Sequence, residues 1–327
     1  MDQVRWGIIG CGNVTEVKSG PAFRKAEHSS LVAVMRRSTE MARDYAERHG
    51  VDRWYDDAVR LIHDPEVNAV YIATPPASHK QYTLAAAAAG KPVYVEKPMA
   101  LSAVECREMI AACRNAKVPL FVAYYRRAQP RFLKIRELLD KGAIGRIKKV
   151  DMQLHKPVQE VDRLGRENWR VNPEIAGCGY FCDLGSHMLD LIQFFLGEIE
   201  WVEGETWNVG GLYTAEDEVA ARFEFAYGLR GNGHWSFHGD HHMDLTVIEG
   251  ERGRISYSHF TEAPVMLERK GRFEVIDIPQ PEHVQQPLIQ QIVDHLLTGT
   301  AVASTGATAL ATAEVMDRIL GRVDPES

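Results

Sequence analysis

The stretch Val4-Arg5-Trp6-Gly7-Ile8-Ile9-Gly10-Cys11-Gly12-Asn13-Val14-Thr15 decides the fold. Its first, largely apolar part predicts a short buried strand, and a glycine turn ends that strand. In a dinucleotide-binding fold the first glycine permits the tight turn and the second lets the backbone approach a pyrophosphate. The helix that follows points its N-terminus at the negative charge. The third glycine of that fingerprint is absent, because Thr15 stands in its place. The alternative is an ordinary turn between a strand and a helix.

Short apolar runs alternate with helical patterns over the first part of the chain. The runs that follow the first strand cover residues 31–35, 69–72, 92–95 and 120–123, and the helical patterns between them cover 39–49, 78–89 and 102–116. Short buried strands separated by helices indicate a parallel sheet with helices on both faces. We therefore predict a doubly wound α/β domain over residues 1–123.

The pattern changes near residue 146, where turns rather than helices separate the strand-like runs. Glycine-containing turns join runs 220–227 with 232–238, 244–248 with 254–258, and 264–268 with 273–278. Consecutive hairpins indicate an antiparallel sheet. Helical patterns over 131–141, 284–297 and 307–320 complete an α+β domain, which we expect to cover residues 124–327.

Composition excludes several classes of protein. The chain has 327 residues, of which 45% are hydrophobic and 25% charged, and its formal net charge is −7. This balance argues against broad binding to nucleic acid or to anionic membranes. We find no long apolar run and no signal-peptide pattern. Five cysteines do not form a disulfide framework. We expect a cytoplasmic protein with neither a nucleic-acid nor a membrane partner.

The residues after the second predicted strand bear on the choice of cofactor. An acidic residue there would hold the ribose hydroxyls of NAD, but the chain reads Met35-Arg36-Arg37-Ser38. Guanidinium groups and a hydroxyl suit a 2′-phosphate, because arginine donates paired, charge-assisted hydrogen bonds. The sequence favours NADP, with NAD as the alternative if the arginines are simply solvated.

A lysine follows the strand at 92–95, within Glu96-Lys97-Pro98. In an open α/β sheet, ligands bind beyond the carboxyl ends of the strands, so Lys97 would face the nicotinamide half of the site. Pro98 fixes the chain after it, with a cis bond as one option. On spacing alone, a solvent-exposed lysine is the favoured interpretation.

A carboxylate and an imidazole lie four residues apart in a helical pattern that begins at Asp183. Such a pair can act together, since His187 can transfer a proton near pH 7 while Asp183 holds substrate or the ring. The alternatives are a helix cap and a structural histidine. We expect no metal, because no further ligands accompany the pair, and Cys178 and Cys182 lack the second pair that a zinc site needs.

In this order the motifs resemble the glucose–fructose oxidoreductase, inositol dehydrogenase and MocA-like family (Gfo/Idh/MocA), and the resemblance covers nearly the whole chain. Further segments carry it: Ala73-Thr74-Pro75-Pro76-Ala77-Ser78-His79, Ala89-Gly90-Lys91-Pro92-Val93, Tyr124-Tyr125-Arg126-Arg127, Gly142-Ala143-Ile144-Gly145 and Gly250-Glu251-Arg252-Gly253-Arg254-Ile255. The resemblance implies a Rossmann domain, a domain with a large open, mainly antiparallel sheet, and a homodimer or homotetramer formed through that sheet.

The resemblance also implies roles for individual residues. Lys97 would hydrogen-bond the reacting oxygen, His187 would donate or accept the proton, and Asp183 would contact substrate. Residues expected near the bound NADP, or NAD, are Gly10, Gly12, Asn13, Val14, Arg36, Arg37, Ser38, Thr74, Pro75, His79, Glu96, Lys97, Arg126, Trp169 and Arg170.

We therefore expect an NADP(H)-dependent oxidoreductase that acts on a sugar, a polyol or a related secondary alcohol or ketone. Two alternatives stay open. One is a glycoside hydrolase that uses a tightly bound nicotinamide transiently, and the other is a non-catalytic NADP-binding sensor. The sequence does not identify the exact substrate, the direction of reaction, the oligomer size or the role of Cys178 and Cys182.

Overall fold

The chain divides into two compact units in the computed structural model, which describes residues 2–322. Unit 1 contains the chain up to Gln129 together with Pro281–Leu310, and unit 2 contains Pro130–Gln280 and the chain from Ala311. The sequence-based division differs in two respects. It lies six residues earlier, at 123, and it assigns residues 281–310 to the second domain. No helix among the described residues is long and apolar enough to cross a membrane.

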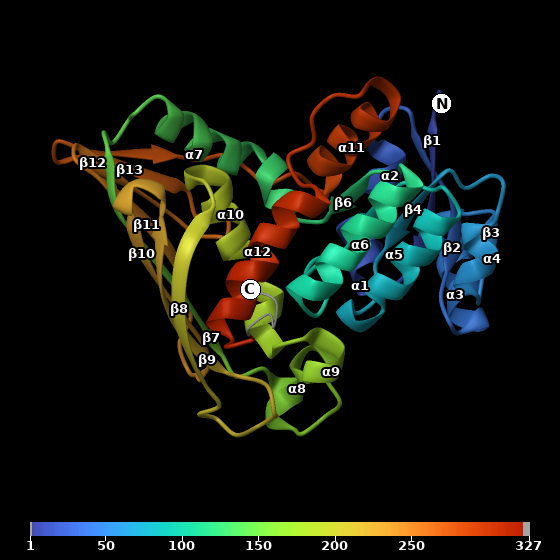
Figure 1. Ribbon diagram of the computed structural model, residues 1–327, viewed down its shortest axis with the longest axis horizontal. Helices are drawn as coiled ribbons and strands as arrows, with labels where there is room; N and C mark the ends of the chain where they lie inside the picture. Colours follow the sequence, from blue (N-terminus) through green and yellow to red (C-terminus); the bar gives the residue numbers. More distant parts are fainter. Residues whose placement is uncertain (1, 323–327) are drawn as a thin grey trace. The chain divides into compact units, whose positions relative to one another are not determined.

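Unit 1 is built on a six-stranded sheet whose strand pairs are all parallel, in the order β3-β2-β1-β4-β5-β6 (Figure 1). The strands are β1 (Val4–Ile9), β2 (Ser29–Met35), β3 (Arg53–Tyr55), β4 (Ala69–Ile72), β5 (Val93–Val95) and β6 (Leu120–Val122). The predicted parallel sheet is confirmed. The strand order reverses between β1 and β4, and ligands of open α/β sheets bind beyond the carboxyl ends of the strands at such a point.

The helices that connect successive strands of unit 1 are α1 (Asn13–Val17), α2 (Ala22–Lys25), α3 (Thr39–His49), α4 (Ala58–Ile62), α5 (His79–Ala88) and α6 (Ala103–Ala116). Unit 1 also contains α11 (Gln286–Thr298), which follows the last strand of unit 2 in the chain. This helix explains why residues 281–310 belong to unit 1. Leu288, Ile289, Ile292 and Val293 are fully buried in the same apolar cluster as Trp6 of β1. An amphipathic helix is held by the surface that buries its apolar face, whatever its distance along the chain.

Unit 2 contains an eight-stranded sheet in the order β14-β13-β12-β11-β7-β10-β9-β8. The strands are β7 (Ile147–Pro157), β8 (Ile199–Trp207), β9 (Glu218–Phe225), β10 (Arg230–Gly239), β11 (Met243–Gly250), β12 (Gly253–Tyr257), β13 (Val265–Arg269) and β14 (Arg272–Ile276). The pairs are antiparallel except β7 with β10, which run parallel. The predicted large, mainly antiparallel sheet is confirmed.

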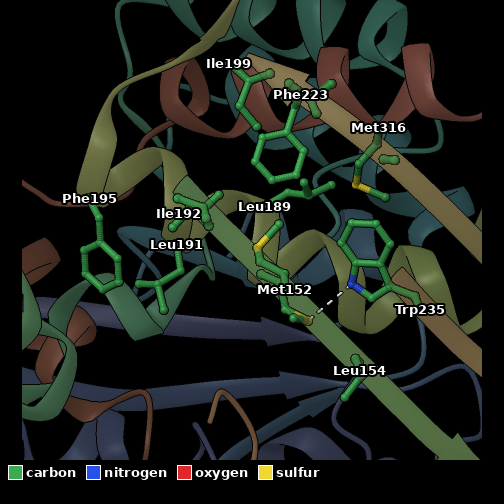
Figure 2. Close-up of a cluster of buried hydrophobic side chains, with 14 of the residues drawn as sticks. Met152, Leu154, Leu189, Leu191, Ile192, Phe195, Ile199, Phe223, Trp235 and Met316 are labelled. Carbon is green, nitrogen blue, oxygen red and sulfur yellow. Dashed lines mark hydrogen bonds between the residues drawn. The ribbon is translucent and has the colours of Figure 1, made fainter. Parts of the chain in front are cut away.

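One face of this sheet forms the core of unit 2. Figure 2 shows Leu189 and Ile192 of α10 (Ser186–Leu196) packed beside Met152, Phe223 and Trp235 of the sheet. Each such side chain contributes about 1.5–3 kcal/mol relative to an exposed position. The short helices α7 (Pro130–Asp140), α8 (Glu160–Arg163) and α9 (Pro173–Ala176) and the C-terminal α12 (Gly306–Ile319) complete the elements that bear on the site.

The opposite face of the sheet carries a chain of histidines. His155 alternates with the buried Leu154 and therefore faces away from the core. Its Nδ1 lies 2.9 Å from His241 Nε2, and its Nε2 lies 2.9 Å from His234 Nδ1. His234 Nε2 in turn lies 3.2 Å from a carboxylate oxygen of Glu218, whose other oxygen contacts His238 Nε2. Several imidazoles thus share one stretch of surface.

This histidine chain predicts a pH-dependent stability. Burial, followed by repulsion from His234 and His241, lowers the pKa of His155 below its ordinary value near 6.5. The unfolded chain therefore takes up this proton more readily than the folded one, and stability is lost as pH falls below about 6.5. When the pH is lowered from about 7.5 to about 5.5, we expect the melting temperature of the His155→Gln variant to fall less than that of the wild type. Melting curves measured across this range test the prediction.

The matched control is His242→Gln. His242 is exposed and follows His241, but within residues 2–322 its ring forms no hydrogen bond to the other histidines. This variant should follow the wild-type pH dependence. Equal pH dependence of the melting temperature in the wild type and in His155→Gln would contradict the prediction. Glu218 affects the stability of the fold at lower pH. Hydrogen bonds from His238 and His234 lower the pKa of its carboxyl, so the stability that the carboxylate contributes is lost only under more acidic conditions.

Candidate functional site

The glycine turn after β1 is fixed by close packing at Gly10. This residue has φ +91°, and an added Cβ would lie 2.7 Å from Thr74 Cγ2 and 2.9 Å from the Thr74 nitrogen. The backbone N–H groups of Gly10 and Cys11 donate to the Met35 carbonyl over 2.8 and 3.1 Å. The turn is therefore tied both to the end of β2 and to the loop after β4, and only glycine suits its first position.

Gly12 differs from Gly10, because the space above it is open. A Cβ built there would have only the Gly10 carbonyl oxygen within 4 Å, at 3.9 Å. Asn13 is exposed and Val14 half-buried beside it, at the start of α1. This helix has five residues. Nothing in the protein itself requires glycine at position 12, so the open space fits a ligand that comes close to the backbone.

Thr15, which replaces the third glycine of the fingerprint, is accommodated internally. It is fully buried, and its Oγ1 donates a 2.8 Å hydrogen bond to the Gly12 carbonyl. The phenolic oxygen of Tyr45 donates to the Thr15 carbonyl over 2.9 Å. The departure from the fingerprint therefore stabilises the turn and leaves the space above Gly12 free.

Arg36, Arg37 and Ser38 follow the carboxyl end of β2. Neither guanidinium forms an ion pair with any residue in the range 2–322, and Arg37 is exposed. Arg36 makes one long contact of 3.4 Å to the Cys11 carbonyl. Ser38 caps α3, with its Oγ accepting from the Met41 N–H over 3.3 Å. Two uncompensated cations thus adjoin the glycine turn.

The loop after β4 contains three of the expected cofactor residues. Thr74 and Pro75 are half-buried, whereas His79 is fully buried at the start of α5. The His79 Nε2 lies 2.7 Å from the Thr74 carbonyl, and its Nδ1 lies 3.0 Å from the Pro98 carbonyl. Burial lowers the pKa of His79 below its usual value. His79 therefore links two loops at the carboxyl ends of β4 and β5, and both of its ring nitrogens face backbone oxygens.

Lys97 lies two residues after Val95, the last residue of β5, and its bond to Pro98 is cis. Its neighbour Glu96 is buried and accepts hydrogen bonds from the Tyr71 hydroxyl at 2.5 Å and from Gln285 Nε2 at 2.6 Å. Burial and the nearby Glu96 raise the pKa of Tyr71 well above its ordinary value. This buried network holds the backbone from which the half-buried Lys97 extends.

Arg126, the remaining expected cofactor residue of unit 1, is buried in the short turn after β6. Its guanidinium carbon lies 5.0 Å from the centre of the Tyr125 ring. The structure thus brings the glycine turn, the loop after β4 and the Glu96-Lys97-Pro98 segment together at one edge of the parallel sheet of unit 1.

Unit 2 holds the other candidate residues. Arg170 Nε lies 3.6 Å from Asp183 Oδ2, and its guanidinium carbon lies 4.6 Å from the centre of the Trp169 ring. Asp183 is in a π-helical turn, Phe181–Gly185, immediately before α10, where the sequence had suggested the start of an α-helix. His187, at the first turn of α10, is only 3% exposed. Such π-turns are frequent at functional sites.

A disulfide precedes these residues. Cys178 and Cys182 are joined, with their Cα atoms 5.1 Å apart; the sequence analysis expected no disulfide framework and left the role of these two cysteines open. The physical reason is local: the π-helical turn in the glycine-rich loop brings two cysteines four residues apart within bonding distance. Cys11, Cys106 and Cys113 are free and buried. The described residues contain no group of three or more His, Cys, Asp or Glu placed to hold a metal ion.

A pocket of about 290 Å³ lies within unit 2 beside Asp183. The sequence analysis did not identify several residues that line it, among them Lys156, Asn168 and Tyr180. Asn168 and Tyr180 are held by the buried Asp162, which accepts from the Tyr180 hydroxyl at 2.5 Å and from Asn168 Nδ2 at 2.8 Å. The lining residues come from the stretch 156–184 together with Phe237, and no sequence motif marks Lys156, Asn168 or Tyr180 within that stretch.

Two family models match the chain. Residues 4–124 match the oxidoreductase family with an NAD-binding Rossmann fold, and residues 132–256 match the GFO/IDH/MocA C-terminal domain. The chain belongs to the GFO/IDH/MocA family. It is an oxidoreductase with an NAD-binding Rossmann fold, and the expected fold and enzyme class are confirmed.

Known proteins of this family resemble all or part of the chain. It is 40% identical to "Oxidoreductase P35" of Formosa agariphila over 98% of this chain and 99% of that protein. It is 32% identical to the 1,5-anhydro-D-fructose reductase of Ensifer adhaerens over 59% of this chain and 57% of that protein. The aldose–aldose oxidoreductase of Caulobacter crescentus, solved with glycerol, is 26% identical, with a TM-score of 0.88 over 98% of this chain and 97% of that one.

Proposed function

We propose that this GFO/IDH/MocA protein is an NADP(H)-dependent oxidoreductase that transfers a hydride between the nicotinamide and a secondary alcohol or ketone of a sugar or polyol. One observation carries the proposal: Lys97 stands at the carboxyl end of β5, at the sheet edge that also holds the glycine turn. The names of relatives support the substrate class, since they include a 1,5-anhydro-D-fructose reductase and a myo-inositol 2-dehydrogenase.

The residues around the glycine turn fit a dinucleotide. The open space above Gly12 would receive the pyrophosphate, and Arg36, Arg37 and Ser38 would hold a 2′-phosphate. Thr74, Pro75 and Lys97 would border the nicotinamide half, with His79 and Glu96 acting through the loops that they hold. The cofactor, when bound, accepts or donates the hydride; the protein supplies orientation and electrostatics.

The proton is assigned to side chains of the protein. During oxidation of an alcohol, the hydroxyl proton would pass to His187 while the Lys97 ammonium stabilises the negative charge developing on the oxygen. During reduction the same groups would act in reverse, with His187 returning the proton. Asp183, whose side chain is 33% exposed, would accept a hydrogen bond from a neighbouring substrate hydroxyl. Trp169, Arg170 and Arg126 are proposed to border the cofactor or substrate.

A parallel assay distinguishes this proposal from its alternatives. Sugars and polyols are offered with NADP⁺, their ketones with NADPH, and chromogenic glycosides with the protein as purified. We expect stoichiometric change in the absorbance of the reduced nicotinamide without glycoside cleavage. Glycoside cleavage with no net change in cofactor would favour the hydrolase, and cofactor binding without any turnover would favour the sensor.

The arginines after β2 give a prediction about cofactor choice. Replacing both, in the Arg36→Ala/Arg37→Ala variant, should weaken NADP binding by about 10- to 100-fold, because charge-assisted hydrogen bonds to the 2′-phosphate are lost. Binding of NAD should change little. Calorimetric titration with both dinucleotides measures the effect.

Arg43→Ala is the matched control, because Arg43 lies on the adjacent α3 and pairs with Glu47 at 2.7 Å. It should bind both dinucleotides as the wild type does. Equal or tighter binding of NAD than of NADP by the wild type would contradict the assigned role of Arg36 and Arg37.

We also infer that two copies associate through the face of the eight-stranded sheet that lies opposite its core. Large apolar side chains are exposed on strands of this face, including Trp201, Trp207, Leu245, Phe273 and Val275. Trp201 and Trp207 alternate with residues that point to the core, such as Val202. These side chains are spread across the face, from the edge strand β8 to the opposite edge strand β14, and they support the homo-oligomer that the family resemblance implies. Sedimentation velocity of the intact protein tests for a homodimer or homotetramer.

A further inference from the structure

The side chains that line the pocket beside Asp183 carry one more positive than negative charge, although the chain as a whole has a net charge of −7. The buried Asp162 carboxylate lies behind this lining, where it accepts hydrogen bonds from Tyr180 and Asn168. Lys156 and Arg170 both line the pocket, and Asp183 is the only acid among its lining residues. The other polar groups in the wall are neutral: Gln159, Asn168 and Tyr180. A pocket with an excess cation in an acidic protein favours a negatively charged ligand over a neutral one.

Lys156 supplies the uncompensated charge. It is half-buried at the end of β7, and no carboxylate in the range 2–322 forms an ion pair with it. Its ammonium nitrogen lies 5.9 Å from the centre of the Phe260 ring. The centre of the His187 ring lies 6.2 Å from the centre of the same Phe260 ring. Lys156 and His187 therefore both lie beside the Phe260 ring within unit 2.

Arg170 supplies a second cation with free donor capacity. Its Nε is 3.6 Å from Asp183, which is beyond hydrogen-bonding distance, and its guanidinium forms no hydrogen bond to a described residue. Stacking over Trp169 at 4.6 Å keeps the guanidinium plane in place. A planar guanidinium with unused N–H groups matches the geometry of a carboxylate.

From this arrangement we propose that the substrate is an acidic sugar, a uronate or an aldonate, whose carboxylate is bound by Lys156 and Arg170. The proposal rests on the proposed oxidoreductase function and narrows its substrate class. The carboxylate would anchor the sugar between Lys156 and Arg170, and a neighbouring hydroxyl would lie beside Asp183, which is 3.6 Å from Arg170. The pocket volume of about 290 Å³ suits part of a monosaccharide.

Substrate pairs that differ in one group test the proposal. D-glucuronate is compared with D-glucose, D-galacturonate with D-galactose, and D-gluconate with sorbitol. D-glucose 6-phosphate tests whether a phosphate group can take the place of the carboxylate. We expect kcat/KM for the preferred acid to exceed that of its neutral partner by at least about tenfold. The KM for the acid should also rise with ionic strength, because salt screens the partly exposed Arg170.

The decisive variant is Lys156→Met, which keeps the aliphatic stem and removes the charge. It should lower the acid-to-neutral ratio of kcat/KM by about 10- to 100-fold, mainly through KM. The matched control is Lys148→Met on the same strand, because Lys148 is exposed and does not line the pocket. This control should keep the wild-type ratio.

Binding is measured separately from turnover, by the thermal shift that each acid produces in wild type and in Lys156→Met. If acids bind in a Lys156-dependent manner without turnover, the acidic ligand is supported and the oxidoreductase role fails. Preference for the neutral partners or for the phosphate would overturn the proposal. So would an unchanged ratio in Lys156→Met, or failure of every acid to bind.

Discussion

The Lys97→Met variant is expected to lose turnover by about 10³-fold while it still binds NADP. Lys97 follows β5 at the sheet edge where the glycine turn lies, and its backbone is held by the buried Glu96. Methionine keeps the apolar stem but cannot donate a hydrogen bond to the reacting oxygen. The charge that develops there during hydride transfer would then lack its donor, so kcat should fall more than cofactor affinity.

Two measurements distinguish this effect from simple loss of structure. Calorimetric titration with NADP and the melting temperature should both stay near wild-type values for Lys97→Met. The variant Lys148→Met removes an exposed lysine that is distant in sequence, and it should keep full turnover. Full activity of Lys97→Met would refute its catalytic role. Loss of activity together with loss of cofactor binding would assign Lys97 to binding alone.

The second large effect is expected at the glycine turn. Gly12→Ala should weaken dinucleotide binding by about 10- to 100-fold, because the new methyl would occupy the space into which the pyrophosphate is proposed to fit. The melting temperature without cofactor should not change, since a Cβ at this position meets only the Gly10 carbonyl oxygen, at 3.9 Å. Titration calorimetry and thermal melting measure the two quantities.

Gly10→Ala provides the contrast. Its Cβ would lie 2.7 Å from Thr74 Cγ2, and the backbone at φ +91° is unfavourable for alanine. This variant should lose about 1–3 kcal/mol of stability even without cofactor. The two neighbouring glycines thus separate a requirement of the fold from a requirement of the ligand. Unchanged dinucleotide affinity in Gly12→Ala would contradict the proposed binding mode.

Much of the fold could be predicted from the sequence because its signals are local. Short apolar strands that alternate with helices predict a parallel sheet, and consecutive glycine turns predict hairpins, as in β11 with β12. Long-range pairing carried no such signal. The parallel pairing of β7 with β10 and the packing of α11 against unit 1 join segments distant in sequence, so only the folded chain shows them.

The candidate site was predictable to a different extent in each unit. The glycine turn and Lys97 follow strands, and strand ends are easily found. Asp183 and His187 were found by spacing, but the π-helical turn and the Cys178–Cys182 disulfide depend on local backbone geometry that residue types do not specify. Lys156 was not singled out, because residue types do not specify the fold of the irregular stretch between β7 and α10 that forms most of the pocket wall.

Hydride transfer itself is the most direct test of the account. The protein is mixed with NADP⁺ and each sugar acid or polyol in turn, and the absorbance of reduced nicotinamide is followed beside the amount of ketone formed. The account predicts that one NADPH appears for each ketone, and that Lys97→Met slows both equally. Turnover of a substrate with no net formation of NADPH, or equal rates in the wild type and Lys97→Met, would contradict it.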